Sequence, residues 1–387
     1  MTKKKTIALG LLVLVSGLVR AQSSTAREAA KKEDIEAPRA GKGDINWLDT
    51  NIISELKGGI FEHVGSRQPL ILATFAEQEM DLARVQLMIE SLRAFGGRFQ
   101  DAPVWVYLTE GLLASESEHL AGIESLGGSF MLGQAPEEAT WFYLSRKVFA
   151  SAQAEAEAAG KADILAWLDV DTIFLQEPGE FILPKGKSLG YRPVMHLNIS
   201  PLYDEPLDDF WKRAYDKMSV PKARGFPMVT VADGDKIRPY INAGCLIVRP
   251  ERGLLREWAE TFPLLYRDPV LKEMCRKDER KRIFIHQVAL SGAFMRHLGR
   301  DEIRELSGRV NYPLFFGEMF GSKRDFHDIG EAVTIRYESF FDNPPPDWEK
   351  RLSGPPDRIA WLKAHLGDVP RGTTLAPQVF ILREAVF

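Results

Sequence analysis

The stretch from Ile164 to Leu175 constrains the fold more than any other part of the sequence. Five apolar residues, 164–168, run without interruption into Asp169, and Asp171 follows before a second apolar run. An apolar run that ends at polar residues predicts a strand buried inside a sheet. In open α/β sheets the ligand crevice lies outside the carboxyl ends of the strands. The pattern therefore predicts that Asp169 and Asp171 stand where charge can take part in chemistry.

Strand and helix patterns alternate along the first half of the chain. They predict strands at 70–75, 103–108, 129–132 and 164–168, and helices at 81–95, 115–126 and 141–159. Such alternation favours an α/β fold with a parallel sheet. The second half predicts a turn at 189–193, strands at 194–199, 245–248, 314–316 and 333–337, and helices at 208–218, 254–262 and 284–290. We expect a single large domain at 65–345 and a tail at 346–387 with a short helix near 361–366.

The composition is that of an ordinary folded domain. Apolar residues make up 45% of the 387 residues, charged residues 27%, and the net charge is −4. This length gives ample material for a core. Because the chain has no overall basic excess, we expect no nucleic-acid partner.

The N-terminus has the pattern of a secretory signal peptide. Lys3, Lys4 and Lys5 precede an apolar run at 7–19, and small residues around Ala21 suit cleavage there. The run is shorter than the ~20 residues that span a bilayer as a helix, so we expect cleavage and no stable membrane span. The sequence thus predicts a signal peptide at 1–21, a flexible leader at 22–60, and export to the periplasm, the cell exterior or a secretory lumen.

The cysteines and histidines give weaker signals. Cys245 lies in an apolar, strand-like run and Cys275 lies among charged residues, which favours two unpaired thiols. A disulfide between them stays an alternative in an oxidising compartment. The histidines do not show the spacing of a usual zinc motif.

Three motifs, taken in order, resemble a known family. They are the D-x-D motif at 168–172, the Asn242-Ala243-Gly244 segment ahead of an apolar strand, and the 286–290 segment, His-Gln-Val-Ala-Leu. With a helix carrying Arg146 and Lys147 before the acidic strand, this set resembles the nucleotide-diphospho-sugar transferases of GT-A fold, especially the glycogenin and bacterial galactosyltransferase-like group. The resemblance covers about 69–343. It implies a Rossmann-like, mixed but mostly parallel sheet flanked by helices.

The resemblance also implies roles for particular residues. Asp169 and Asp171 would hold a divalent cation, Mn²⁺ or Mg²⁺, against the diphosphate of a nucleotide sugar. Such a hard cation, held by carboxylates, neutralises the charge of the leaving group. Lys147, or its neighbour Arg146, would face the donor.

The two remaining motifs would lie near the sugars. Asn242, Ala243 and Gly244 offer an amide and two small residues that a donor or acceptor sugar could approach closely. Gln287 matches a position near the reacting sugar carbon. His286 replaces the acid that the family usually has; it is a packed helix residue, a proton acceptor or a metal neighbour.

The third metal ligand departs from the family pattern. The family places a His after a late strand, ahead of a Lys-Pro-Trp segment, whereas this chain has Ile335-Arg336-Tyr337-Glu338 there. Three alternatives follow: His327 is the third ligand, the ion is held weakly, or Arg336 supplies positive charge in its place. We hypothesise weakened metal dependence.

The leading functional hypothesis is a glycosyltransferase that moves a sugar from a nucleotide-diphosphate donor to a glycan or other hydroxyl acceptor. Retention of the anomeric configuration is implied by the resemblance, and inversion would follow if His286 served as a base. Because nucleotide sugars are not expected outside a bacterial cytoplasm, an exported, non-catalytic GT-A-like protein that binds glycans is the alternative. A nucleotidyl or phosphoryl transferase is weaker, since no Gly-rich phosphate loop supports it.

Overall fold

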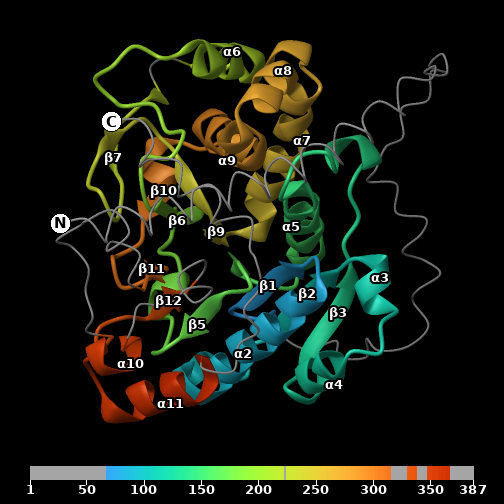
Figure 1. Ribbon diagram of the computed structural model, residues 1–387, viewed down its shortest axis with the longest axis vertical. Coiled ribbons are helices and arrows are strands. Elements are labelled where there is room, and N and C mark those ends of the chain that lie inside the picture. Colours follow the sequence, from blue (N-terminus) through green and yellow to red (C-terminus); the bar gives the residue numbers. More distant parts are fainter. Residues whose placement is uncertain (1–66, 222–223, 315–328, 338–346, 367–387) are drawn as a thin grey trace, which may run out of the picture. The chain divides into compact units, whose positions relative to one another are not determined.

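The computed structural model describes residues 67–221, 224–314, 329–337 and 347–366 (Figure 1). The predicted signal peptide at 1–21, the predicted leader at 22–60 and the candidate ligand His327 lie outside the described residues. None of the helices in these ranges is long and apolar enough to cross a membrane.

A seven-stranded sheet forms the centre of the fold. Its strand order is β10-β6-β9-β4-β1-β2-β3. Within this sheet, as described, only β9 runs antiparallel to its neighbours, β4 and β6. The strands are β1 (Ile71–Ala76), β2 (Val104–Leu108), β3 (Gly128–Leu132), β4 (Leu165–Leu168), β6 (Leu189–Pro193), β9 (Ile241–Val248) and β10 (Ile303–Glu305). The predicted fold class, α/β with a mixed and mostly parallel sheet, is confirmed.

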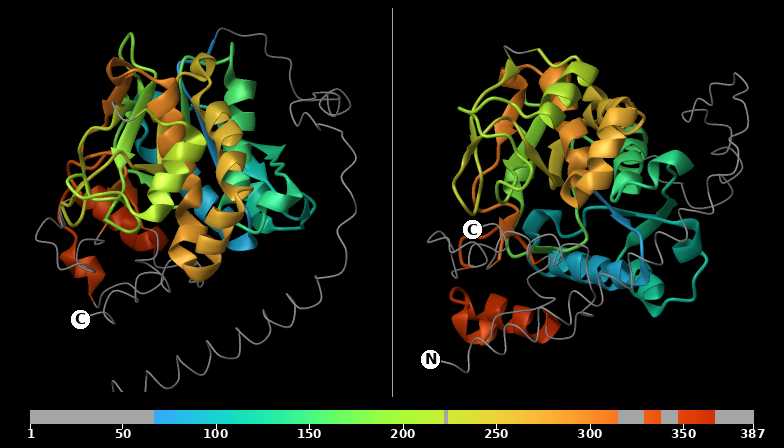
Figure 2. Two further views of the ribbon diagram at one scale, coloured as in Figure 1. Left: turned by 90° about the horizontal axis from the view of Figure 1, so that it is seen from above. Right: turned by 45° about the horizontal axis from the view of Figure 1, so that its top comes forward.

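Helices cover both faces of the sheet. Alternate residues of one strand pack into two different core clusters: Trp105 and Tyr107 pack with α5 (Ser145–Ala158), α7 (Leu254–Tyr266) and α9 (Glu279–His297), whereas Val104 and Val106 pack with α2 (Glu79–Phe95). Figures 1 and 2 show α2 on the side of the sheet opposite α5, α7 and α9. Burial on both faces explains the unbroken apolar runs of the strands.

The other helices are short or lie at the periphery. They are α3 (Glu110–Leu113), α4 (Glu118–Ser125), α6 (Asp209–Met218), α8 (Pro269–Lys277), α10 (Trp348–Arg351) and α11 (Pro356–Leu366). Helix α8, which was not predicted from the sequence, follows α7 after a short break at Asp268. The Asp268 side chain accepts hydrogen bonds from the backbone of Val270 and Leu271 and so begins α8.

Two predictions for the region 189–199 were wrong. The segment 189–193, predicted as a turn, is strand β6, and 194–199, predicted as a strand, is irregular. The strand has a glycine at position 190 because the side chains of Leu183, Leu306 and Ile247 occupy the space that a β-carbon would need. The glycine thus reflects close packing, not a turn.

Two small sheets accompany the large one. In the first, β12 (Thr334–Arg336) lies between β11 (Tyr312–Pro313) and β5 (Thr172–Phe174). In the antiparallel pairing of β12 with β5, Arg336 lies opposite Thr172. This register brings a late part of the chain beside the D-x-D motif. The second small sheet pairs β7 (Met228–Val229) with β8 (Lys236–Ile237).

Both cysteines are buried and free in the structure. Burial raises the pKa of each thiol to about 12, so both stay protonated at neutral pH. This agrees with the expectation of two unpaired thiols.

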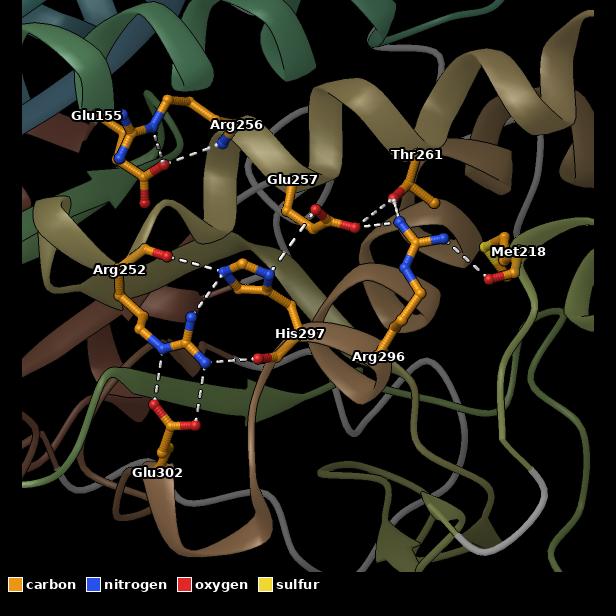
Figure 3. Close-up of polar contacts among 9 residues, drawn as sticks. All are labelled: Glu155, Met218, Arg252, Arg256, Glu257, Thr261, Arg296, His297 and Glu302. Atoms are coloured by element: carbon orange, nitrogen blue, oxygen red, sulfur yellow. Dashed lines mark hydrogen bonds and ion pairs between the residues drawn. The ribbon is translucent and has the colours of Figure 1, made fainter.

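A polar network links α5, α7 and α9 (Figure 3). Arg252 binds the Glu302 carboxylate through two hydrogen bonds of 2.8 and 3.2 Å, and it also donates to the carbonyl of His297. On α5, Glu155 is fully buried and its Oε2 accepts from the backbone N–H of Arg256 at 2.9 Å. Burial raises the pKa of Glu155 to about 7, because desolvation outweighs the bonds from Arg256.

The raised pKa of Glu155 predicts a pH-dependent loss of stability. The folded chain binds more protons than the unfolded chain between pH 4.5 and about 7, so the free energy of unfolding falls as pH rises through this window. At about 1.4 kcal/mol per pKa unit the loss is roughly 3 kcal/mol. In urea denaturation from pH 4 to 8, Glu155→Gln should remove this slope, whereas Glu157→Gln, at a partly exposed position of the same helix, should retain it. Equal slopes in all three proteins would contradict the assignment.

Candidate functional site

The D-x-D motif forms a tight turn at the carboxyl end of β4. The Asp169 N–H donates to the Gly244 carbonyl of β9 at 3.0 Å, and the Thr172 N–H donates to the Asp169 carbonyl at 3.2 Å. The first bond holds the turn against the start of β9. Since β1 and β4 are parallel neighbours, their carboxyl ends meet at this edge of the sheet. The turn therefore lies where ligands of α/β sheets bind.

Lys147 reaches the turn from the first turn of α5. Its Nζ forms an ion pair with Oδ1 of Asp169, and its side chain is only 9% exposed. Arg146 points elsewhere: its Nε lies 3.3 Å from Oε1 of Glu77. Of the two predicted donor-facing cations, Lys147 is the one that the structure brings to the D-x-D motif.

Arg336 bridges the two aspartates from β12. Its Nη2 lies 3.2 Å from Oδ2 of Asp169 and its Nε lies 2.5 Å from Oδ1 of Asp171. The arginine side chain is 5% exposed and that of Asp171 is 4% exposed. The pairing of β12 with β5 fixes the position of Arg336, so its guanidinium belongs to the site.

These cations determine the protonation state of Asp169. Burial by itself raises the pKa of its carboxyl, but Lys147 and then Arg336 lower it, and the net effect is a pKa below the ordinary value of 3.8. The Asp169 carboxylate is therefore ionised throughout the neutral range.

Gly244 allows the charged groups to approach the backbone. A β-carbon at this position would overlap the guanidinium of Arg336 and the carboxylate of Asp169. The side chain of Asn242 accepts from the Gly244 N–H at 2.7 Å. The three-residue motif is thus explained by packing around the ion pairs as well as by a possible sugar contact.

Gln287 and His286 lie side by side on α9 but differ in their contacts. Oε1 of Gln287 accepts from the Ala243 N–H at 3.3 Å, which links α9 to the start of β9. Nδ1 of His286 lies 2.7 Å from the Ile283 carbonyl and must carry the proton, because a carbonyl can only accept. Burial, and then the nearby charge of Lys147, lower the pKa of His286 to about 3. His286 therefore has the contacts of a packed helix residue. Because its pKa is about 3, its imidazole ring is neutral near neutral pH.

A buried acid that was not predicted from the sequence lies beside the motif. Asp81, in the first turn of α2, accepts from the backbone N–H groups of Glu77 and Gln78 at 3.0 and 3.1 Å. Burial raises its pKa, and the negative charge of Asp171 adds to this increase. Nη1 of Arg84 lies 3.7 Å from Asp81. An acid in the first turn of the helix that follows β1, the parallel neighbour of β4, was the signal that could have identified it.

The residues present do not fit a bridging divalent ion. A hard cation needs carboxylate oxygens that are open to it, but Lys147 and Arg336 already lie against the carboxylates of Asp169 and Asp171. In the described ranges, no group of three His, Cys, Asp or Glu side chains could hold a metal ion. The two carboxylates therefore serve as partners of Lys147 and Arg336.

The contacts of Gly244 predict that Gly244→Ala destabilises the fold. The added methyl group must displace Arg336 or Asp169, and overpacking of this kind costs about 1–3 kcal/mol. Gly111→Ala is the matched control, since its β-carbon would meet no atom within 4 Å. Chemical denaturation should show a lower midpoint for Gly244→Ala alone. Wild-type stability in both variants would contradict the packing described here.

The low pKa of His286 predicts that this side chain stays neutral from pH 5 to 8. NMR titration of ¹⁵N-labelled histidines should show one ring whose shifts are constant over this range, identified by its loss in His286→Asn. A titration midpoint between pH 5.5 and 7.5 for that ring would contradict the burial.

Three solved glycosyltransferase structures are similar to this chain. An active-site mutant of LgtC is 14% identical, covering 77% of this chain and 97% of that one, with a TM-score of 0.44. Mouse xyloside xylosyltransferase 1 in its apo form is 14% identical, covering 70% and 98%, with a TM-score of 0.41. Galactosyltransferase LgtC in complex with donor and acceptor sugar analogs is 15% identical, covering 79% and 98%, with a TM-score of 0.39. No curated protein matches the sequence.

A family model gives the assignment. The model described as the Rhodobacterales glycosyltransferase domain matches residues 75–298, more than half of the chain. The match includes Lys147, both aspartates of the D-x-D motif and Gln287, while Arg336 lies beyond its end. The expected resemblance to glycosyltransferases is thereby confirmed, and the chain belongs to the Rhodobacterales glycosyltransferase domain family.

Proposed function

We propose that this chain transfers a sugar from a nucleotide-diphosphate donor to a hydroxyl acceptor, such as that of a glycan, in the manner of GT-A transferases. The observation that carries the proposal is the cluster of Lys147, Arg336 and Asp169 at the carboxyl ends of β1 and β4. This is the edge of the sheet where a ligand would bind, and the cluster places two fixed cations there.

The chemistry of the leaving group explains why cations are needed. As the bond between the sugar and the diphosphate breaks, negative charge grows on the diphosphate, and positive groups fixed beforehand stabilise that charge. Lys147 and Arg336 are held in place by Asp169 and Asp171, so little reorganisation is required. The N-terminus of α5, which carries Lys147, adds the partial positive charge of a helix dipole.

The motif at Asn242 to Gly244 and the side chain of Gln287 would border the sugar. Gln287 holds the Ala243 N–H, so we assign it a positioning role on the start of β9. Retention of configuration belongs to the proposal. It is supported by the burial of His286, whose low pKa makes it a poor base for an inverting attack.

The cellular location is also part of the proposal. We propose that the segment 1–21 is a signal peptide and that the chain works outside the cytoplasm. One observation favours the second candidate, an exported protein that binds glycans without turnover. Arg336 and Lys147 form ion pairs with the carboxylates that a catalytic metal would need as ligands.

Donor turnover distinguishes the two candidates. The full chain should release nucleoside diphosphate from one member of a panel of UDP-, GDP- and CDP-sugars mixed with glycan acceptors. Lys147→Met should lower kcat/KM about 100-fold or more, as expected when one stabilising cation is lost. Lys161→Met, an exposed lysine that pairs with Glu157 just after α5, should have no effect. NMR of the product then gives the anomer.

Glycan binding without any nucleotide binding or release would favour the second candidate. A fully active Lys147→Met variant would remove this residue from the donor site.

A further inference from the structure

We infer that Arg336 and Lys147 together take the place of the divalent cation, so that the donor diphosphate binds this chain without a metal. The inference rests on the proposed function, because it concerns the same donor site. It decides between the alternatives that the sequence leaves open for the missing third ligand.

Arg336 lies where a metal bridging the two aspartates would lie. A metal held by both aspartates must lie between their carboxylates, and the guanidinium of Arg336 already bridges them, 3.2 Å from Asp169 and 2.5 Å from Asp171. The opposite oxygen of Asp169, Oδ1, is in an ion pair with Lys147. An ion could enter only if these contacts broke.

The charges of the two side chains support the same inference. Lys147 and Arg336 carry one positive charge each, so together they bring to the two aspartates the same charge as one divalent ion. Arginine stays protonated at all relevant pH values and its fork of five N–H donors matches phosphate as well as carboxylate oxygens. Arg336 thus adds a permanent positive charge to that of Lys147 at the place where a diphosphate would bind.

Arg336 is held firmly in this position. Its side chain is 5% exposed, and β12 is held between β11 and β5. Gly244 leaves room for the guanidinium, where any larger residue would overlap it. Removing Arg336 from this position would leave the Asp171 carboxylate, which is 4% exposed, without its bridging guanidinium, which is strongly unfavourable for a buried charge.

The test compares metal and nucleotide binding by the full-length wild-type chain. Mn²⁺ alone, followed by electron paramagnetic resonance, should leave the signal of free Mn²⁺ unchanged at equimolar protein. Calorimetry with UDP, GDP, CDP and ADP should find at least one ligand whose Kd differs by less than about threefold between excess EDTA and excess Mn²⁺.

Different results of these binding experiments would overturn the metal-free site and the proposed function. Nucleotide binding that requires Mn²⁺ would overturn the inference and leave the proposed function intact. Tight Mn²⁺ binding that is lost in His327→Ala would also overturn it, by showing His327 as the third ligand. If no nucleotide binds with or without Mn²⁺, the proposed function fails, and the inference fails with it.

Variants of Arg336 test its role directly. In EDTA, Arg336→Gln should weaken nucleotide binding about tenfold or more, and Arg336→Lys should weaken it less, because it keeps the charge but not the fork. Arg304→Gln, on the edge strand β10, is the matched control and should bind like the wild type. Unchanged affinity in a folded Arg336→Gln variant, with its thermal midpoint measured in parallel, would overturn the inference. If that variant does not fold, Arg336→Lys and the wild-type metal titration decide.

Discussion

The bridge from Arg336 to Asp169 and Asp171 is the interaction on which the rest of the site depends. Taking charged groups out of water is costly unless each has a partner. Here the aspartates meet Arg336 and Lys147 at the edge of the main sheet. The bridge joins β12 to the turn after β4, and the ion pair between Lys147 and Asp169 joins α5 to the same turn, although these segments are far apart in the sequence. The glycine at position 244 of β9 has the same cause, because a residue with a side chain would overlap Arg336 and Asp169.

The surroundings of the bridge are electrically balanced. Asp81 and Arg84 form a further pair near Asp171, so acids and bases alternate through the buried region. A balanced and rigid cluster can hold its cations ready for an anionic ligand, which is what electrostatic preorganisation requires. The neutral, buried His286 adds no charge of its own. The site is therefore built to stabilise negative charge on a ligand and is poorly suited to proton transfer by histidine.

Much of the fold could be predicted from the sequence because strands buried on both faces have unbroken apolar runs. The alternation up to Asp169 predicted the parallel part of the sheet, and the family motifs predicted a glycosyltransferase. β6 was missed because Gly190 and Pro193 have the usual appearance of a turn, and only tertiary packing shows why a glycine is needed. Arg336 was a candidate, but its partner depends on the pairing of β12 with β5, which no local pattern reveals. The burial of His286 likewise follows from the packing of α9 and could not be read from the motif.

We propose that Lys147 and Arg336 provide the positive charge that a nucleotide-diphosphate donor needs. The most direct measurement is a crystal structure with a bound nucleoside diphosphate, grown with Mn²⁺ and recorded at the manganese absorption edge. We expect phosphate oxygens in contact with Lys147 and Arg336, and no anomalous peak between Asp169 and Asp171. A manganese peak held by both aspartates, with Arg336 displaced, would contradict it.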